Sequence, residues 1–173
     1  MKRYVSDPIP HPEMQGEGEG TEIGNAELVF YDVDPTEDSY QARVFLNAPE
    51  ADHTTSTEDE RFAGWFTVFG HGGCFGDDED HCAPPPAAQD PFDIRFPVGI
   101  PRQTKKVRIT KALRALGPVE SFTVTVVAVV PGEDGPQEAD VLDFGNLRLL
   151  TYEETHAGES AALAAVAAHA ASR

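Results

Sequence analysis

Seven short stretches of the chain alternate between apolar and polar residues, and this period of two constrains the fold more than any other feature. Each stretch is rich in β-branched or aromatic residues and is bounded by Gly, Pro, Asn or Asp, a pattern typical of β-strands. So many short strands predict a mainly β fold, either an antiparallel β-sandwich or a jelly-roll-like barrel. The expected strands are residues 26–33, 41–47, 62–69, 92–96, 105–110, 121–130 and 147–152. The stretch 121–130 is apolar on both faces at one end, which predicts a central strand.

Two stretches have helical rather than strand character. Residues 110–117 offer Thr110 as an N-cap, two leucines three residues apart, and Gly117 as a stop, so they predict one short helix. Residues 157–173 are rich in alanine and predict a carboxy-terminal helix with only a thin apolar stripe. Residues before 25 are rich in Pro, Glu and Gly. We therefore expect an extended acidic arm over 1–24, a β-sandwich domain over 25–152, and an Ala-rich helical tail over 153–173.

The composition disfavours several classes of partner. Thirty acidic residues against 13 basic residues give a net charge of −17, which repels nucleic acid backbones and anionic lipid surfaces. No apolar run reaches the ~20 residues of a membrane span, and the first residues lack the apolar core of a signal peptide. We expect no nucleic acid partner, no membrane association, and a cytoplasmic protein or one exported only with a partner.

One loop gathers the residues that could carry chemistry. His71, Cys74, His81 and Cys82 lie within twelve residues, and thiolate and imidazole are ligands that zinc or copper prefer. A second interpretation is a disulfide between Cys74 and Cys82, the only cysteines of the chain. A third is a pair of free thiols in a loop that its glycines shape. The sequence leaves all three open.

The chain lacks the common catalytic signatures. There is no G-x-S-x-G elbow, no Walker loop, no H-E-x-x-H motif and no EF-hand ligand pattern. Asp32 and Asp34 lie two apart on an expected strand and could share a face, but a solvated strand end explains them as well. Thus no residues are predicted to be catalytic.

The segments taken together resemble a known family. "ARVFLNAP", "RFAGWFTVFGHGGC", "KKVRITKALRALG", "SFTVTVVAVVPG" and "VLDFGNLRLL" follow one another as in the carboxy-terminal β-domain that comes after the copper domain of tyrosinases and polyphenol oxidases. The "GHGGC" loop with its following "HC" is similar to the version in bacterial tyrosinase-like proteins. The positions that carry the resemblance, from about 26 to 152, are Phe62, Gly64, Phe66, Ile109, Leu113, Leu116, Gly117 and residues 123–130.

This resemblance implies a non-catalytic domain that covers or assists a type-3 copper oxidase, which would be its partner domain or subunit. Such domains pack over the copper entrance and can place a side chain in the substrate pocket, for which Trp65 and Phe75 are candidates. The six histidines here are scattered without an H-x-x-x-H pair, so the chain lacks the copper ligands of a tyrosinase and is not expected to oxidise phenols alone. The alternative function is a copper or zinc carrier that uses His71, Cys74, His81 and Cys82.

Overall fold

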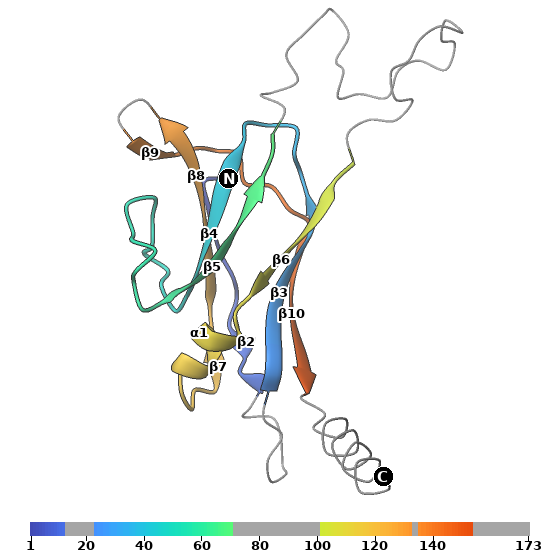
Figure 1. Ribbon diagram of the computed structural model, residues 1–173, viewed down its shortest axis with the longest axis vertical. Helices are drawn as coiled ribbons and strands as arrows, with labels where there is room; N and C mark the ends of the chain where they lie inside the picture. The colour runs from blue at the N-terminus through green and yellow to red at the C-terminus, as the bar shows by residue number, and fades with distance from the viewer. Residues whose placement is uncertain (13–22, 71–100, 133–134, 154–173) are drawn as a thin grey trace, which may run out of the picture.

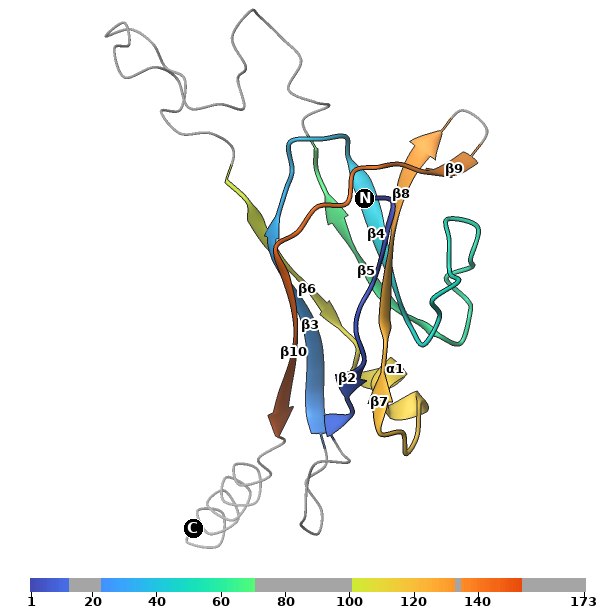
Figure 2. The ribbon, with the colours of Figure 1, turned by 180° about the vertical axis from the view of Figure 1, so that it is seen from behind.

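The computed structural model describes residues 1–12, 23–70, 101–132 and 135–153, and these fold into two antiparallel sheets packed face to face (Figures 1 and 2). The larger sheet has the order β1 (Arg3–Val5), β8 (Val124–Gly132), β4 (Tyr40–Leu46), β5 (Phe62–Val68), and β9 (Gly135–Glu138) also pairs with β8. The smaller sheet has the order β10 (Asn146–Glu153), β3 (Ile23–Val33), β6 (Gln103–Arg108). At one end lie a short pair, β2 (Ile9–Pro10) with β7 (Ser121–Phe122), and helix α1 (Thr110–Ala115).

The predicted fold class is confirmed: the described residues form a mainly β sandwich with one short helix, and their strands do not close into a barrel. The expected strands 26–33, 41–47, 62–69, 105–110 and 147–152 correspond to β3, β4, β5, β6 and β10, with ends shifted by at most three residues. The expected strand 92–96 and the expected helical tail after 153 lie outside the described residues.

The main core lies between the two sheets and is built from the inward residues of each strand. Phe30 of β3 packs against Phe66 of β5 with ring centroids 4.8 Å apart, and against Phe144 at 5.4 Å. Leu113 of α1 is buried in the same cluster, so the helix closes one end of the sandwich. The alternation in the sequence therefore exists because one face of each sheet is removed from water.

The strand expected over 121–130 is interrupted, although it is central as predicted. Asn47 adopts a left-handed backbone (φ 51°), its N–H donates to the Thr123 carbonyl at 2.9 Å, and its Oδ1 accepts from the Thr123 N–H at 2.9 Å. This reciprocal pair separates β7 from β8. From Val124 to Val129 every residue of β8 is buried, because both faces of the strand are covered.

The first twelve residues of the expected extended arm include two short strands that pair with the sandwich. Arg3 of β1 pairs with Val127 of β8, and Ile9 of β2 pairs with Phe122 of β7. His11 is fully buried, with its ring edge-on to Phe122 at a centroid distance of 6.2 Å. Short strands of three and two residues have no detectable sequence pattern, so only their pairing partners reveal them. The remainder of the expected arm, residues 13–22, lies outside the described residues.

The helix starts differently from the prediction. Ile109, not Thr110, is the N-cap residue, and no side chain caps the helix. The Thr110 hydroxyl instead accepts a hydrogen bond from the backbone N–H of Ala26 at 2.9 Å, which ties the helix to the start of β3. The predicted stop is confirmed, because Gly117 lies just past the helix with φ 67°, a conformation that favours glycine.

Gly64 brings the two sheets together along one edge. It has φ 147°, which side chains rarely adopt, and a Cβ placed on it would lie 2.6 Å from Cγ1 of Val107 on β6. Strands β5 and β6, from different sheets, therefore run side by side at this seam (Figures 1 and 2). The glycine within the F-x-G-x-F stretch is thus required by the close approach of β6.

Candidate functional site

The outward face of β5 carries Trp65, the predicted site residue that the structure describes. Phe66 and Val68 point into the core, so the residues between and beside them face outward. Trp65 is 53% exposed, and Phe69, directly after the strand, is 83% exposed. We call Trp65, Thr67 and Phe69 the β5 strip. Exposing two large aromatic side chains on the same face of one strand is unfavourable in free energy, because their apolar surface is left in water.

Only part of the larger sheet's outer face is open. The segment 48–61 folds over one end of that face and buries a second, smaller core against it. Arg43 of β4 fixes the segment: its guanidinium donates to the carbonyls of His53 at 3.2 Å and Thr55 at 3.3 Å, and to Oε1 of Gln41 at 3.0 Å. The smaller core consists of Phe45, Ala48, Ala51, Val127 and Val129, with Phe62 packed against it.

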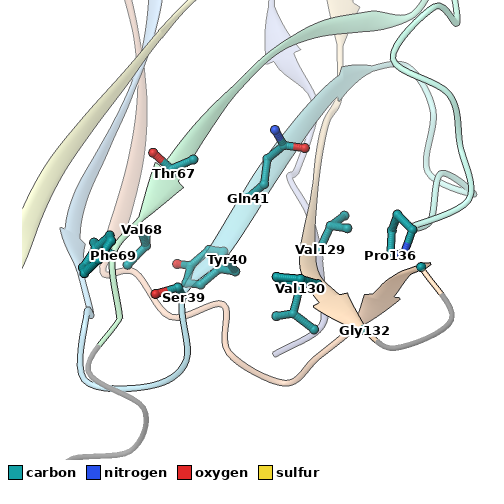
Figure 3. Close-up of a pocket in the computed structure, with 12 residues that line it drawn as sticks. Ser39, Tyr40, Gln41, Thr67, Val68, Phe69, Val129, Val130, Gly132 and Pro136 are labelled. Carbon is teal, nitrogen blue, oxygen red and sulfur yellow. The ribbon is translucent and has the colours of Figure 1, made fainter.

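The other end of this face is an open groove of about 590 Å³. It runs between the ends of β5, β4, β8 and β9, with Phe69 and Val68 on one side and Pro136 on the other (Figure 3). Its polar groups are the side chains of Ser39, Gln41 and Thr67. The groove is lined by Ser39, Tyr40, Gln41, Thr67, Val68, Phe69, Val129, Val130, Pro131, Gly132, Gly135 and Pro136. An apolar groove with an exposed aromatic at its rim suits a hydrophobic binding partner.

Gly70 fixes the end of the β5 strip. The Ser39 hydroxyl accepts a hydrogen bond from the Gly70 N–H at 2.9 Å, and a Cβ on Gly70 would lie 2.0 Å from the Glu37 carbonyl oxygen. No side chain fits there. Phe69, which directly precedes Gly70, is therefore held at a defined position although its own side chain is exposed.

A charged bridge ties together loops at the same end of the sandwich. Nη2 of Arg102 lies 2.9 Å from Oδ2 of Asp34 and 3.0 Å from Oδ2 of Asp143. Burial raises the pKa of Asp34, but hydrogen bonds from Thr36 and the charge of Arg102 outweigh it and hold this pKa below its usual range. The bridge thus joins the segments after β3, before β6 and before β10.

The carboxylates of Asp32 and Asp34 do not form an acid–base pair. Asp32 has φ 55° at an irregularity of the β3–β6 pairing, and its side chain is exposed, while Asp34 is occupied by Arg102. Nearby, burial raises the pKa of the Tyr40 phenol, and the charges of Asp143 and Asp34 raise it further. The Tyr40 phenol stays protonated and Asp34 is ion-paired with Arg102, so neither group is free to act as a general base.

The predicted His and Cys residues of the loop, His71, Cys74, His81 and Cys82, lie outside the described residues, as does Phe75. Within the ranges that the structure describes, no group of three or more His, Cys, Asp or Glu side chains could hold a metal ion. No helix in the described part of the chain is long and apolar enough to cross a membrane.

Phe69 is the site residue that sequence reasoning missed. Its signal was present: in the stretch 62–69 the inward residues fall on even positions from Phe66 onward, so Phe69 shares its face with Trp65.

Comparison with known proteins gives similarity in structure alone. No protein-family model matches the chain, and no curated protein does. A latent aurone synthase, which is a polyphenol oxidase from a natural source, matches with a TM-score of 0.51 and 16% identity over 88% of this chain. The recombinantly expressed latent enzyme matches with a TM-score of 0.50 and 15% identity, also over 88%. Both matches span only 25% of the aurone synthase chain. The protein therefore shares the fold of a region that makes up a quarter of a latent polyphenol oxidase.

Proposed function

We propose that this chain is a companion domain of a type-3 copper oxidase, which it covers and keeps latent without being catalytic itself. The observation that supports this most is the match over 88% of the chain to a part of a polyphenol oxidase that is itself latent. The order of segments in the sequence points to the same family. The copper would belong to the oxidase, and this chain would supply a surface.

The β5 strip and the adjoining groove suit that surface. Exposed aromatic side chains beside an apolar groove are typical anchors of protein interfaces, where the central residues contribute most of the binding free energy. Trp65 projects from a strand whose other face is locked in the core, so it can insert into a partner without ordering a flexible segment. Phe69, fixed by Gly70, offers a second anchor on the same face.

The proposed action is steric. A domain seated over the copper entrance prevents a diphenol from reaching the metal, so the oxidase regains activity only when the domain is displaced or removed. The described residues form a packed core that would hold the blocking surface rigid. Among them, the side chains near the groove include no ionised group positioned to attack or deprotonate a substrate.

The test is a titration of enzyme rate. The type-3 copper oxidase is purified from the source of this chain by following copper content and diphenol oxidation, and any domain of this kind is removed from it. Adding the chain should lower the rate of diphenol oxidation in a saturable way, with a stoichiometry near one.

Two variants give the test its control. The double variant W65S/F69S should require roughly tenfold more protein for the same inhibition, because two anchors are lost. T67S changes the same strip without removing an aromatic and should behave as the wild type. A rate that stays constant at all concentrations of the wild-type chain would overturn the proposal.

A further inference from the structure

The positive charges of this acidic chain are concentrated in one stretch. Residues 102–118 contain six of the 13 Lys and Arg residues and none of the 30 Asp and Glu residues. The stretch has a formal charge of +6, and the remainder, with seven basic and 30 acidic residues, has −23. A separation of charge this large orients any charged partner that approaches the domain.

The fold places this stretch at the seam beside the β5 strip. It forms β6 and α1, and β6 is the edge strand of its sheet next to β5 (Figures 1 and 2). Val107 points into the core, so Lys106 and Arg108 on either side of it are exposed, as is Lys111 on α1. We call Lys106, Arg108 and Lys111 the basic strip.

Two members of the basic strip are available to a partner. Lys106 lies 3.8 Å from Oε2 of Glu27, whereas Arg108 and Lys111 have no ion-pair partner among the residues that the structure describes. Both line a cavity of about 460 Å³ at the seam, together with Phe62 of β5. Arginine is enriched in protein interfaces, so an exposed guanidinium without an ion-pair partner in this part of the chain suits a docking surface.

The opposite wall of the same cavity is acidic. It carries Glu58, Asp59 and Glu60 from the segment over the sheet, and Asp59 is held by Arg61 at 2.8 Å. The boundary between positive and negative surface therefore runs through this cavity. A partner with negative charge gains by contacting β6 and α1 and loses by shifting toward the segment 48–61, so the boundary fixes the register of docking.

We propose that the basic strip docks against an acidic surface of the copper oxidase, beside the anchors of the β5 strip. This rests on the proposed function and adds to it the charge of the partner and the orientation of the complex. A folded acidic protein fits better than nucleic acid, because the formal charge of −23 on the remainder of the chain repels an extended polyanion.

The experiment measures the affinity of the chain for the purified oxidase at low and physiological salt. R108E and K111E should each weaken Kd about five- to tenfold at low salt, since each replaces an attraction with a repulsion. The difference should shrink as salt is added. K2E is the matched control, because Lys2 is also exposed and precedes β1, at the opposite edge of the larger sheet from β5. It should change Kd less than twofold.

The possible results distinguish the proposed function from the inference about the basic strip. If the oxidase binds and R108E and K111E behave as K2E does, the basic strip is not the docking surface, although the proposed function stands. If the oxidase does not bind the wild-type chain at all, the proposed function and this inference both fail. If the wild-type chain binds a 20-nucleotide single-stranded DNA at physiological salt and R108E abolishes that binding, the strip serves nucleic acid and the inference is overturned.

Discussion

Replacing Gly64 by alanine should destabilise the sandwich at the seam between its two sheets. The new Cβ meets two penalties: a backbone with φ 147° and a Val107 Cγ1 atom only 2.6 Å away. Backbone strain of this kind costs about 1–2 kcal/mol, and overpacking a filled core costs about 1–3 kcal/mol. Together they predict a loss of about 2–5 kcal/mol in the free energy of unfolding, or a Tm lower by about 4–20 °C for a domain of this size.

The assay is urea unfolding followed by Trp65 fluorescence and circular dichroism, with two comparison variants. Gly117→Ala has positive φ but nothing within 4 Å of its new Cβ, so it should show the backbone penalty alone, about 1–2 kcal/mol. The pair G64A/V107A removes the clash, so its loss should be smaller than the sum of the single losses by about 1 kcal/mol. A G64A protein within 0.5 kcal/mol of wild type, or strictly additive losses in the pair, would refute the close approach of β5 and β6.

Three further results are expected. Arg43→Ala removes the guanidinium that holds segment 48–61, so amide hydrogen exchange should rise in that segment while β8 stays protected. Unchanged exchange in segment 48–61 would show that the hydrogen bonds of Arg43 do not hold it. Hydrogen bonds from Arg61 lower the pKa of Asp59 to about 2, so the contribution of Asp59 to the free energy of unfolding is complete above pH 4 and is lost as pH falls toward 2. Asp59→Asn should therefore flatten the curve of stability against pH in this range. An unaltered curve would contradict this role of Asp59. For the loop 71–82, a thiol count in denaturant together with a metal analysis should separate the three interpretations: no free thiols, with one exposed by Cys74→Ser, indicates a disulfide; two thiols with stoichiometric copper or zinc indicate a metal site; two thiols without metal indicate free cysteines.

The strands of the sandwich were predictable because burial of one face leaves its period in the sequence. The outward Trp65 and the inward Phe66 follow the same rule. The glycine of the F-x-G-x-F stretch was recognised from resemblance, and the structure adds its physical reason, which is the approach of Val107.

Features that depend on a distant partner were not predictable. His11 lies within the expected extended arm, yet the pairing of β2 with β7 buries it beside Phe122. Thr110 is a residue type that favours the N-cap position, but its hydroxyl instead accepts a hydrogen bond from the backbone N–H of Ala26, 84 positions away in the sequence. In both cases a contact with a residue distant in sequence determines the environment of the side chain.

The candidate site was predictable only in part for a related reason. Alternation places Trp65 and Phe69 on one face, but it does not reveal that segment 48–61 covers one end of that face and leaves the other end open. The groove depends on the antiparallel pairing of β9 with β8. Strand β9 begins at Gly135, which has φ 118°. The basic strip was visible as an acid-free stretch, whereas its position beside β5 follows from the seam at Gly64.

Trp65 is the only tryptophan of the chain, so it gives a single-site measurement of the proposed contact. Protein labelled with 5-fluorotryptophan has one fluorine resonance, and its shift between water and heavy water reports exposure of the indole. The free chain should show a large solvent shift, and a saturating amount of the copper oxidase should abolish it while diphenol oxidation stops. A solvent shift that persists while the oxidase is fully inhibited would place the contact elsewhere and contradict a docking surface on β5.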